Sequence, residues 1–164
     1  MGDSTRITRG TLASEMKSNF VVPSFRLWRS TDQEIPNTTF TAIAFNNAAT
    51  FDTDDGHDSV TNNTRYTIQT PGVWSFYSGV RWEASSSGIR HVFIRINGSL
   101  AIDEEIPDVD TASTHRFGAD TAYALEEGDY VELVVWQNVG APLDVLSVDA
   151  SSPYLAGVWH GNTS

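Results

Sequence analysis

The chain has 164 residues, no cysteine and a formal net charge of −11. This length fits one domain with its own core plus a short additional segment. The absence of cysteine excludes disulfide bonds and thiolate zinc sites, and the excess of acidic residues is unfavourable for binding the anionic backbone of nucleic acid. No apolar run reaches the roughly 18 residues that a membrane-spanning helix needs, so we expect no membrane insertion.

The first 23 residues differ from the rest of the chain in charge. Residues 1–30 hold five basic and two acidic residues, whereas residues 31–164 hold five basic and nineteen acidic ones. A basic segment on an acidic body is typical of an arm that docks on another surface, and a mobile, solvated terminus is the alternative. We therefore predict an anchoring arm at residues 1–23 and a head domain at residues 24–164. The predicted anchoring residues are Arg6, Arg9, Phe20, Val21 and Val22.

From residue 24 onward, short runs that alternate between apolar and polar residues predict β-strands. Turn residues separate them, among them Asn97-Gly98, a dipeptide typical of tight hairpins. We predict loops at residues 46–63 and at the acidic segment 101–111, and no long helix. The predicted strands are residues 25–29, 38–45, 65–70, 73–82, 89–96, 115–125, 129–137, 144–148 and 154–159. This pattern of short strands with frequent turns indicates an all-β sandwich or barrel.

One of these strands carries information about association. Its residues Val131, Leu133 and Val135 lie on one face, and Tyr130, Val134 and Trp136 lie on the other. A strand that is apolar on both faces must be covered on both. We predict that a neighbouring subunit supplies the second cover; the alternative is a monomer in which a loop covers that face. The predicted trimer interface consists of Phe93, Tyr130, Val134 and Trp136.

Several motifs occur in an order that resembles a known family. They are Gly72-Val73-Trp74-Ser75-Phe76, Gly128-Asp129-Tyr130-Val131 and the terminal strand Tyr154-Leu155-Ala156-Gly157-Val158-Trp159, with Asn62 or Asn63 preceding the strand at 65–69. Over about residues 25–160 the chain resembles the jelly-roll globular head shared by complement-1q and tumour necrosis factor proteins. The resemblance implies an antiparallel, two-sheet jelly-roll sandwich of about ten strands that trimerises.

The sequence departs from the animal members of this family in three ways. Trp74 stands where tyrosine is usual, no collagen-like Gly-x-y stalk is present, and residues 1–10 lack the apolar segment of a secretion signal. A bare head with a short arm resembles versions found in tailed bacteriophages, which serve as tail fibres, minor tail proteins or capsid surface proteins. The resemblance therefore implies a non-enzymatic homotrimer on a virion surface, assembled in the host cytoplasm.

The expected partners follow from that assignment. They are other virion proteins, of the capsid or the tail, for the arm and a host surface glycan or protein for the head loops. The alternative function is a secreted cytokine-like or glycan-binding soluble ligand. An enzyme is not expected, because the sequence has no Gly-x-Ser-x-Gly nucleophile elbow, no Gly-rich phosphate-binding loop and no recognisable acid–base context.

The segment 51–58 is the strongest candidate for a metal site. Its carboxylates Asp52, Asp54 and Asp58 are closely spaced around Gly56, and calcium prefers six to eight oxygen ligands. The spacing is not that of an EF-hand loop, and an acidic surface turn is the alternative, since Asp and Gly favour turns. We therefore expect no cofactor, with calcium as the one candidate.

Other chemistry-bearing residues have simpler interpretations. The acidic run 103–110 is expected to be a solvated loop, with an anionic recognition loop or a second cation site as the alternatives. None of the four histidines lies in a zinc-binding pattern, and His91 is expected to be a hydrogen-bonded strand residue or part of an interface. The five tryptophans all lie on predicted strands, which favours packing over sugar stacking.

Overall fold

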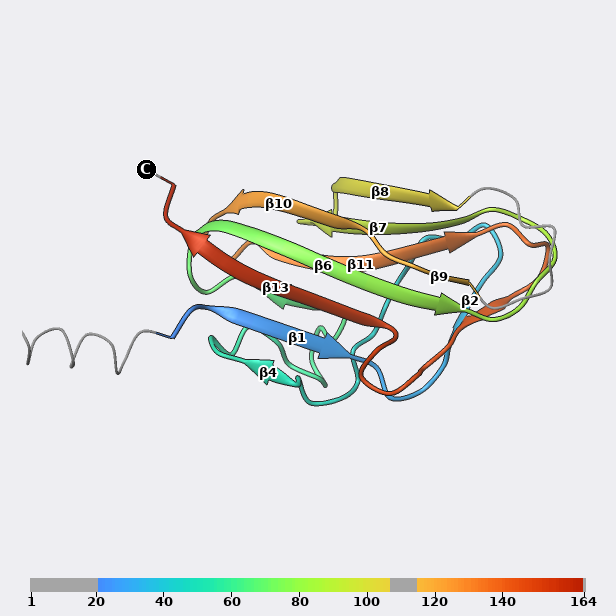
Figure 1. Cartoon of the computed structure of the whole chain (residues 1–164), viewed down its shortest axis with the longest axis horizontal. Helices are drawn as coiled ribbons and strands as arrows, with labels where there is room; N and C mark the ends of the chain where they lie inside the picture. The colour runs from blue at the N-terminus through green and yellow to red at the C-terminus, as the bar shows by residue number, and fades with distance from the viewer. Residues whose placement is uncertain (1–20, 107–114, 164) are drawn as a thin grey trace, which may run out of the picture.

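The computed structural model describes residues 21–106 and 115–163, with segments 100–106 and 115–117 described by their backbone alone. This part of the chain forms a sandwich of two antiparallel β-sheets and contains no helix (Figure 1). No candidate for a membrane-spanning helix occurs among these residues. The predicted all-β jelly-roll class is confirmed, and the first strand begins at Ser24.

The first sheet has eight strands. Its path runs β2 (Gln33–Ile35), β12 (Leu143–Val145), β6 (Gly72–Trp82), β13 (Tyr154–Gly161), β1 (Ser24–Trp28) and β4 (Phe51–Asp52), while β9 (His115–Phe117) and β10 (Asp120–Leu125) also pair with β6. The second sheet has five strands. Its path runs β3 (Thr41–Ala42), β11 (Tyr130–Gln137), β7 (Arg90–Ile96) and β8 (Leu100–Ile106), and β5 (Arg65–Thr67) also pairs with β11.

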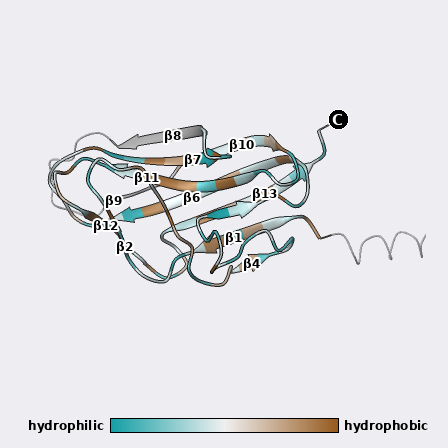
Figure 2. Ribbon diagram, turned by 180° about the vertical axis from the view of Figure 1, so that it is seen from behind, coloured by the Kyte–Doolittle hydropathy of each residue, from teal (hydrophilic) through white to brown (hydrophobic). Residues whose placement is uncertain are grey.

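The core lies between the two sheets and follows the alternation of the strands. In β6 the side chains of Trp74, Phe76 and Trp82 are fully buried, and in β11 Leu133 and Val135 are fully buried opposite them. Apolar residues recur along β1, β6, β7 and β11 in Figure 2. Because side chains two apart point to the same face, every second residue of these strands reaches the core, and the residues between them form the outer faces.

Three sequence expectations about local structure need correction. The acidic segment 101–111, expected to be a loop, is strand β8 as far as Ile106, and its remainder lies outside the described residues. The expected strand 38–45 is regular only over β3, and the expected loop 46–63 contains the short strand β4. Residues 100–106 form a strand because they pair with β7 across the Asn97-Gly98 turn, where Leu100 lies opposite Ile96.

Candidate functional site

The outer face of the second sheet carries a group of touching rings. The second-sheet patch consists of Phe40, His91, Phe93, Val134 and Trp136. The ring of Phe40 lies 5.3 Å from that of Phe93 and 6.2 Å from that of Trp136, measured between centroids. His91 stacks on Phe93 at 5.4 Å and meets Trp136 edge-on at 5.5 Å. The structure therefore brings together three of the four residues predicted for the trimer interface.

This patch is largely covered from within the chain. Val134 is only 2% exposed, although it points away from the core. Phe40 precedes β3 on one side of β11 and contacts Phe93 on the other side, so its ring lies across β11. Phe93 and Trp136 are half-buried, and Phe40 itself is 63% exposed. The chain thus supplies much of the second cover that the sequence assigned to a neighbouring subunit.

The other end of the same outer face is charged. Tyr130, the fourth predicted interface residue, lies there under the guanidinium of Arg65, whose central carbon is 4.2 Å from the ring centroid. The nearly buried carboxylate of Glu132 accepts hydrogen bonds from Arg95, at 2.8 and 3.0 Å, and from the hydroxyl of Thr64 at 3.1 Å. Tyr130 is therefore separated from the second-sheet patch, and its contact residues are polar.

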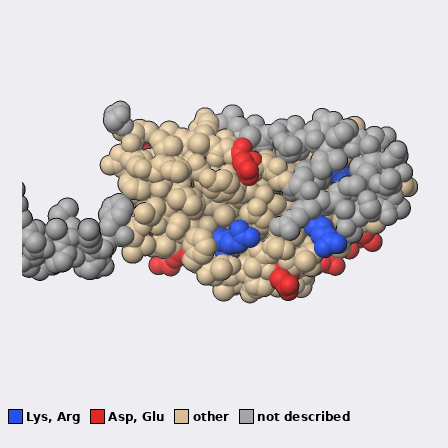
Figure 3. Space-filling view, viewed as in Figure 1, with Lys and Arg blue, Asp and Glu red and all other residues tan. Residues whose placement is uncertain are grey.

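Among the described residues, none covers the outer face of the first sheet in this way. The first-sheet face is defined by Phe51 on β4, Tyr77 on β6, and Tyr154, Ala156 and Val158 on β13. Phe51 and Tyr77 are each 45% exposed, and Val158 is 36% exposed. The strand registers join Phe51, Arg26, Ala156 and Tyr77 into one row across four strands. Figure 3 shows this side of the molecule with few charged side chains over β1, β6 and β13.

Two contacts order the middle of the first-sheet face. The guanidinium of Arg26 lies over the ring of Tyr154, 4.0 Å from its centroid, and donates to the carbonyl oxygen of Ala150 at 2.9 Å. The ring of Tyr154 in turn lies directly over Gly79, where a Cβ atom would come within 2.4 Å of the ring. The sequence analysis did not identify this face; its signal is the small and aromatic residues that alternate with the core positions of β6.

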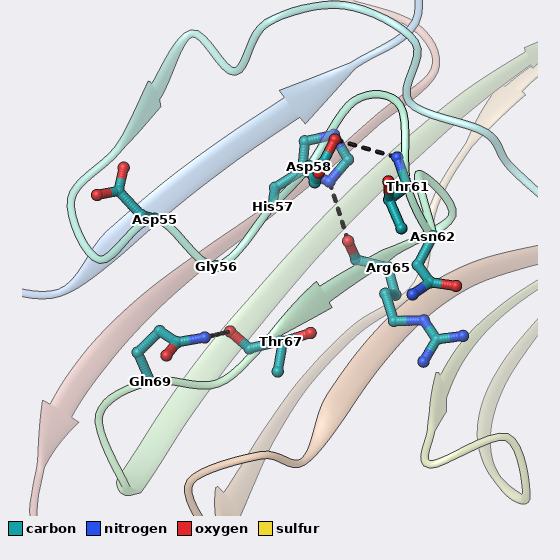
Figure 4. Close-up of a pocket in the computed structure, with 9 residues that line it drawn as sticks. All are labelled: Asp55, Gly56, His57, Asp58, Thr61, Asn62, Arg65, Thr67 and Gln69. Carbon is teal, nitrogen blue, oxygen red and sulfur yellow. Dashed lines mark hydrogen bonds between the residues drawn. The ribbon is translucent and has the colours of Figure 1, made fainter.

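A pocket of about 290 Å³ opens at the edge of the second sheet (Figure 4). The β5 pocket lies between the loop at residues 55–62 and strand β5 with the turn that follows it. Gly56 and Thr67 join the two walls, because the amide of Thr67 donates to the carbonyl of Gly56 at 2.8 Å. The His57 ring nitrogens lie 3.0 Å from the carbonyl oxygen of Arg65 and 3.1 Å from that of Phe45.

The three aspartates predicted as calcium ligands have separate partners. Asp52 accepts from the amide of His57 at 3.1 Å and from the hydroxyl of Tyr66 at 3.2 Å. Asp54 accepts from the hydroxyl of Thr70 at 2.7 Å. Asp58 accepts from two amides of its own turn, at 2.8 and 3.0 Å. In the part of the chain that the structure describes, no three acidic or histidine side chains are placed to hold a metal ion. Calcium binding stays a prediction without geometric support.

The same contacts shift two pKa values in opposite directions. The pKa of Asp58 is lowered, because its carboxylate accepts hydrogen bonds from the backbone amides of Thr61 and Val60. The pKa of Tyr66 is raised, first because its phenol is buried and then because the carboxylates of Asp52 and Asp54 lie nearby. Both groups therefore keep their ordinary charge states at neutral pH, and their hydrogen bonds fix the loop.

The remaining candidates lie in various parts of the fold. Arg6, Arg9 and Phe20 of the predicted arm lie outside the described residues, while Val21 and Val22 are 65% and 42% exposed. All five tryptophans lie on strands, and two of them, Trp74 and Trp82, are fully buried, as the packing interpretation predicts.

No protein-family model and no curated protein matches the sequence. Solved structures do match. The globular domain of zebrafish complement 1qA protein superposes with a TM-score of 0.59 and 14% identity, covering 86% of this chain and 99% of that domain. Murine APRIL gives a TM-score of 0.61 with 11% identity over 85% of this chain and 100% of its own. The Eiger TNF from S. frugiperda gives 0.56 and 13%, over 87% of this chain and 95% of its own.

The chain has the jelly-roll fold of complement-1q and tumour necrosis factor globular domains. The predicted resemblance is thus confirmed at the level of the fold. At these identities the similarity establishes the architecture of the head, and the function has to be argued from its surfaces.

Proposed function

We propose that this protein is a non-enzymatic homotrimer whose subunits pack through the first-sheet face. The observation that carries the proposal is the exposure of Phe51, Tyr77 and Val158 on a face with few charges. Apolar side chains gathered on one face of a soluble domain mark an interaction site. Stable subunit interfaces commonly bury roughly 2,000 Å² or more, which requires a broad surface of this kind.

This placement differs from the interface expected from the sequence. The residues Phe93, Val134 and Trp136 already pack against Phe40 within one subunit, so association there would bury less new apolar surface. In the described part of the chain, nothing comparable covers the first-sheet face. A trimer built on it leaves the second-sheet patch and the β5 pocket on the outside of the assembly, where they remain available to other molecules.

The role that fits this trimer best is that of a bacteriophage surface protein. Residues 1–23 anchor it to the capsid or tail, and the head projects outward as a decoration, head-fibre or minor tail protein. Its support is the contrast between a basic N-terminal segment, which suits docking on another protein, and an acidic body that disfavours nucleic acid. Three copies of one weak surface site then gain affinity for a host surface through multivalency.

A secreted cytokine-like ligand is the second candidate function. The observation in its favour is the fold similarity to murine APRIL and to the Eiger TNF, each covered over 95% or more of its length. Both functions require a trimer, so oligomeric state alone does not separate them. The fate of the arm does, because a soluble ligand binds its partner through the head.

The decisive experiment compares the full chain with a variant that lacks residues 1–23. Light scattering should give three times the mass of one chain for both. In particles assembled with each version, mass spectrometry should find the full chain and not the truncated one. A monomeric full chain would contradict the trimer, and equal incorporation of both versions would contradict anchoring by the arm.

A further inference from the structure

Asn97-Gly98 is the one Asn-Gly dipeptide in the sequence. It lies in the turn at residues 97–99, called the β7–β8 turn, and both residues are exposed (Figure 1). Both have positive φ, 51° at Asn97 and 73° at Gly98, as a tight hairpin turn requires. Every other asparagine is followed by a residue with a side chain, so the backbone nitrogen after Asn97 is the least hindered of the set.

The side chain of Asn97 holds this turn against the beginning of β11. Its Oδ1 accepts from the amide of Tyr130 at 2.9 Å, and its Nδ2 donates to the carboxylate of Asp129 at 2.8 Å. The backbone amide of Asn97 also donates to the carbonyl oxygen of Tyr130 at 3.0 Å. Both polar atoms of the carboxamide are therefore bound, and these bonds fix its position relative to Gly98.

The contact with Asp129 depends on the amide nitrogen. An aspartate at position 97 could still accept from the amide of Tyr130, but it would present a carboxylate oxygen to Asp129 where Nδ2 now donates. Asp129 accepts from the amide of Glu126 through its other oxygen, so its own turn holds it in place. Two carboxylates at this distance repel each other. Loss of the nitrogen would therefore turn an attraction into a repulsion.

Asparagine can lose this nitrogen in a reaction with its own backbone. The nitrogen of the next residue attacks Cγ, the Cγ–Nδ2 bond breaks, and ammonia leaves with the proton of the attacking nitrogen. Water then opens the cyclic imide at either carbonyl and yields aspartate or isoaspartate. The amide of Gly98 donates to no described residue, whereas Cγ of Asn97 is held by the two bonds of its carboxamide. Opening of these two bonds is therefore the step that the fold controls.

We propose that Asn97 is a modification site, at which the carboxamide deamidates and the product releases the β7–β8 turn from β11. The bond to Asp129 limits the rate, because Cγ can turn toward the nitrogen of Gly98 only after that bond breaks. The isoaspartate product also lengthens the backbone of the turn that fixes the register of β7 and β8. The inference goes beyond the proposed function and does not depend on trimer formation, since every residue involved belongs to one chain.

The test incubates the full chain at 37 °C, at pH 7 and at pH 9. Peptide mapping by mass spectrometry should find conversion of the amide to the acid at Asn97 before any other asparagine. The conversion should be faster at pH 9, because the attacking nitrogen must lose its proton. Asn138 is the internal control: its side-chain oxygen also accepts from a backbone amide, that of Ile89 at 2.6 Å, but Val139 follows it. Asn138 should stay unconverted over the same period.

Two variants test the contacts of Asn97. Asp129→Ala removes the partner of Nδ2 and should speed the conversion about fivefold, as the loss of one hydrogen bond predicts. Asn97→Asp imitates the product and covers the case in which Asp129→Ala disturbs its own turn. It should raise the solvent-exchange rates of the amides at positions 97 and 130, measured by NMR, by about fivefold as well. Asn138→Asp is its matched control and should leave both exchange rates unchanged.

Three results would overturn the proposal. The first is conversion of another asparagine before Asn97, and the second is a rate at Asn97 that Asp129→Ala leaves unchanged. The third is an Asn97→Asp variant whose amides at positions 97 and 130 exchange as slowly as those of the parent chain. Early conversion at Asn97, faster in Asp129→Ala, together with faster exchange in Asn97→Asp, supports both the site and the release of the turn.

Discussion

Both outer faces of the sandwich carry apolar side chains, but described residues of the chain cover these side chains on one face only. On the second sheet, the ring of Phe40 lies across β11, and Val134 is left 2% exposed. On the first sheet, Tyr77 and Val158 are exposed and nothing in the described chain crosses them. The comparison teaches that an apolar outer face predicts association only where the chain has not covered that face itself.

The faces also differ in their charged contacts. The second sheet places the ion pair of Arg95 and Glu132 at its outer face, where the carboxylate is nearly buried. On the first sheet, the guanidinium of Arg26 lies over the ring of Tyr154 and donates to a backbone carbonyl. Arg26 is a single charge held against its own chain, whereas burial of the second-sheet end would desolvate both members of an ion pair, so we expect a lower desolvation cost at the first-sheet face.

Placing a carboxylate on each face in turn tests which of the two faces forms the subunit interface. Tyr77→Glu should reduce the mass in light scattering from that of three chains to that of one, because an unpaired charge would be buried at the subunit interface. Phe40→Glu is the matched change on the second sheet, at an even more exposed ring. It should leave the trimer intact. If Phe40→Glu dissociates the trimer and Tyr77→Glu does not, the interface lies on the second sheet, at the residues expected from the sequence.

The ion pair of the second sheet allows a prediction about stability. Arg95→Ala should lower the free energy of unfolding by about 2–3 kcal/mol, because it leaves the nearly buried Glu132 carboxylate with only the hydroxyl of Thr64. Glu132→Ala should cost less, since the side chain of Arg95 is 30% exposed and water can solvate it. Urea unfolding of both variants measures the difference, and a larger loss for Glu132→Ala would contradict this account.

The contact between Gly79 and Tyr154 tests the order of the first-sheet face. Gly79→Ala would place a methyl group within 2.4 Å of the ring of Tyr154, so the ring must move. We expect a loss of about 1–3 kcal/mol in thermal unfolding, as for other small-to-large changes in packed sites. A second variant that adds Tyr154→Ala removes the obstructing ring, and the two changes should then be strongly non-additive. Additive losses would mean that the ring does not limit Gly79.

Long strands could be predicted from the sequence because alternation accumulates over many residues. The segments assigned to β6, β7, β11 and β13 match the structure to within two residues at each end. Strands of two or three residues, such as β2 and β4, leave no period to detect. In β8 the alternation of Leu100 and Ile102 favoured a strand, but the acidic residues that follow indicated a loop. The segment is a strand because it pairs with β7 along its whole length.

The functional surfaces were harder to predict, because they depend on residues far apart in sequence. Nothing near Val134 in the chain indicates that Phe40 will shield it. The aspartates at 52–58 suggested calcium, but their oxygens are occupied by amides and hydroxyls that only the folded loop brings near.

The smallest expected effect lies at the end of the first sheet, where β2 pairs with β12. The pKa of Asp144 is raised there, first by burial and then by the nearby carboxylates of Glu83, Asp32 and Glu34. The folded protein therefore binds more protons than the unfolded chain between the ordinary pKa of about 3.9 and the raised value, and stability falls as pH rises through that interval. At neutral pH the destabilisation by Asp144 is complete.

Asp144→Asn should remove this destabilisation. Because Asp144 is partly exposed and solvent screens its charge, we expect a gain of only about 0.2–0.5 kcal/mol at pH 7, which shrinks on acidification and disappears below about pH 4. Asp58→Asn should have the opposite effect. Because the pKa of Asp58 is lowered in the folded protein, its carboxylate stabilises the fold at pH values above its ordinary pKa, and this stabilisation is lost as the pH falls. Differential scanning calorimetry across pH 3–8 should therefore show a raised midpoint for Asp144→Asn and a lowered one for Asp58→Asn. Shifts of the same sign would mean that burial and the neighbouring carboxylates do not govern Asp144.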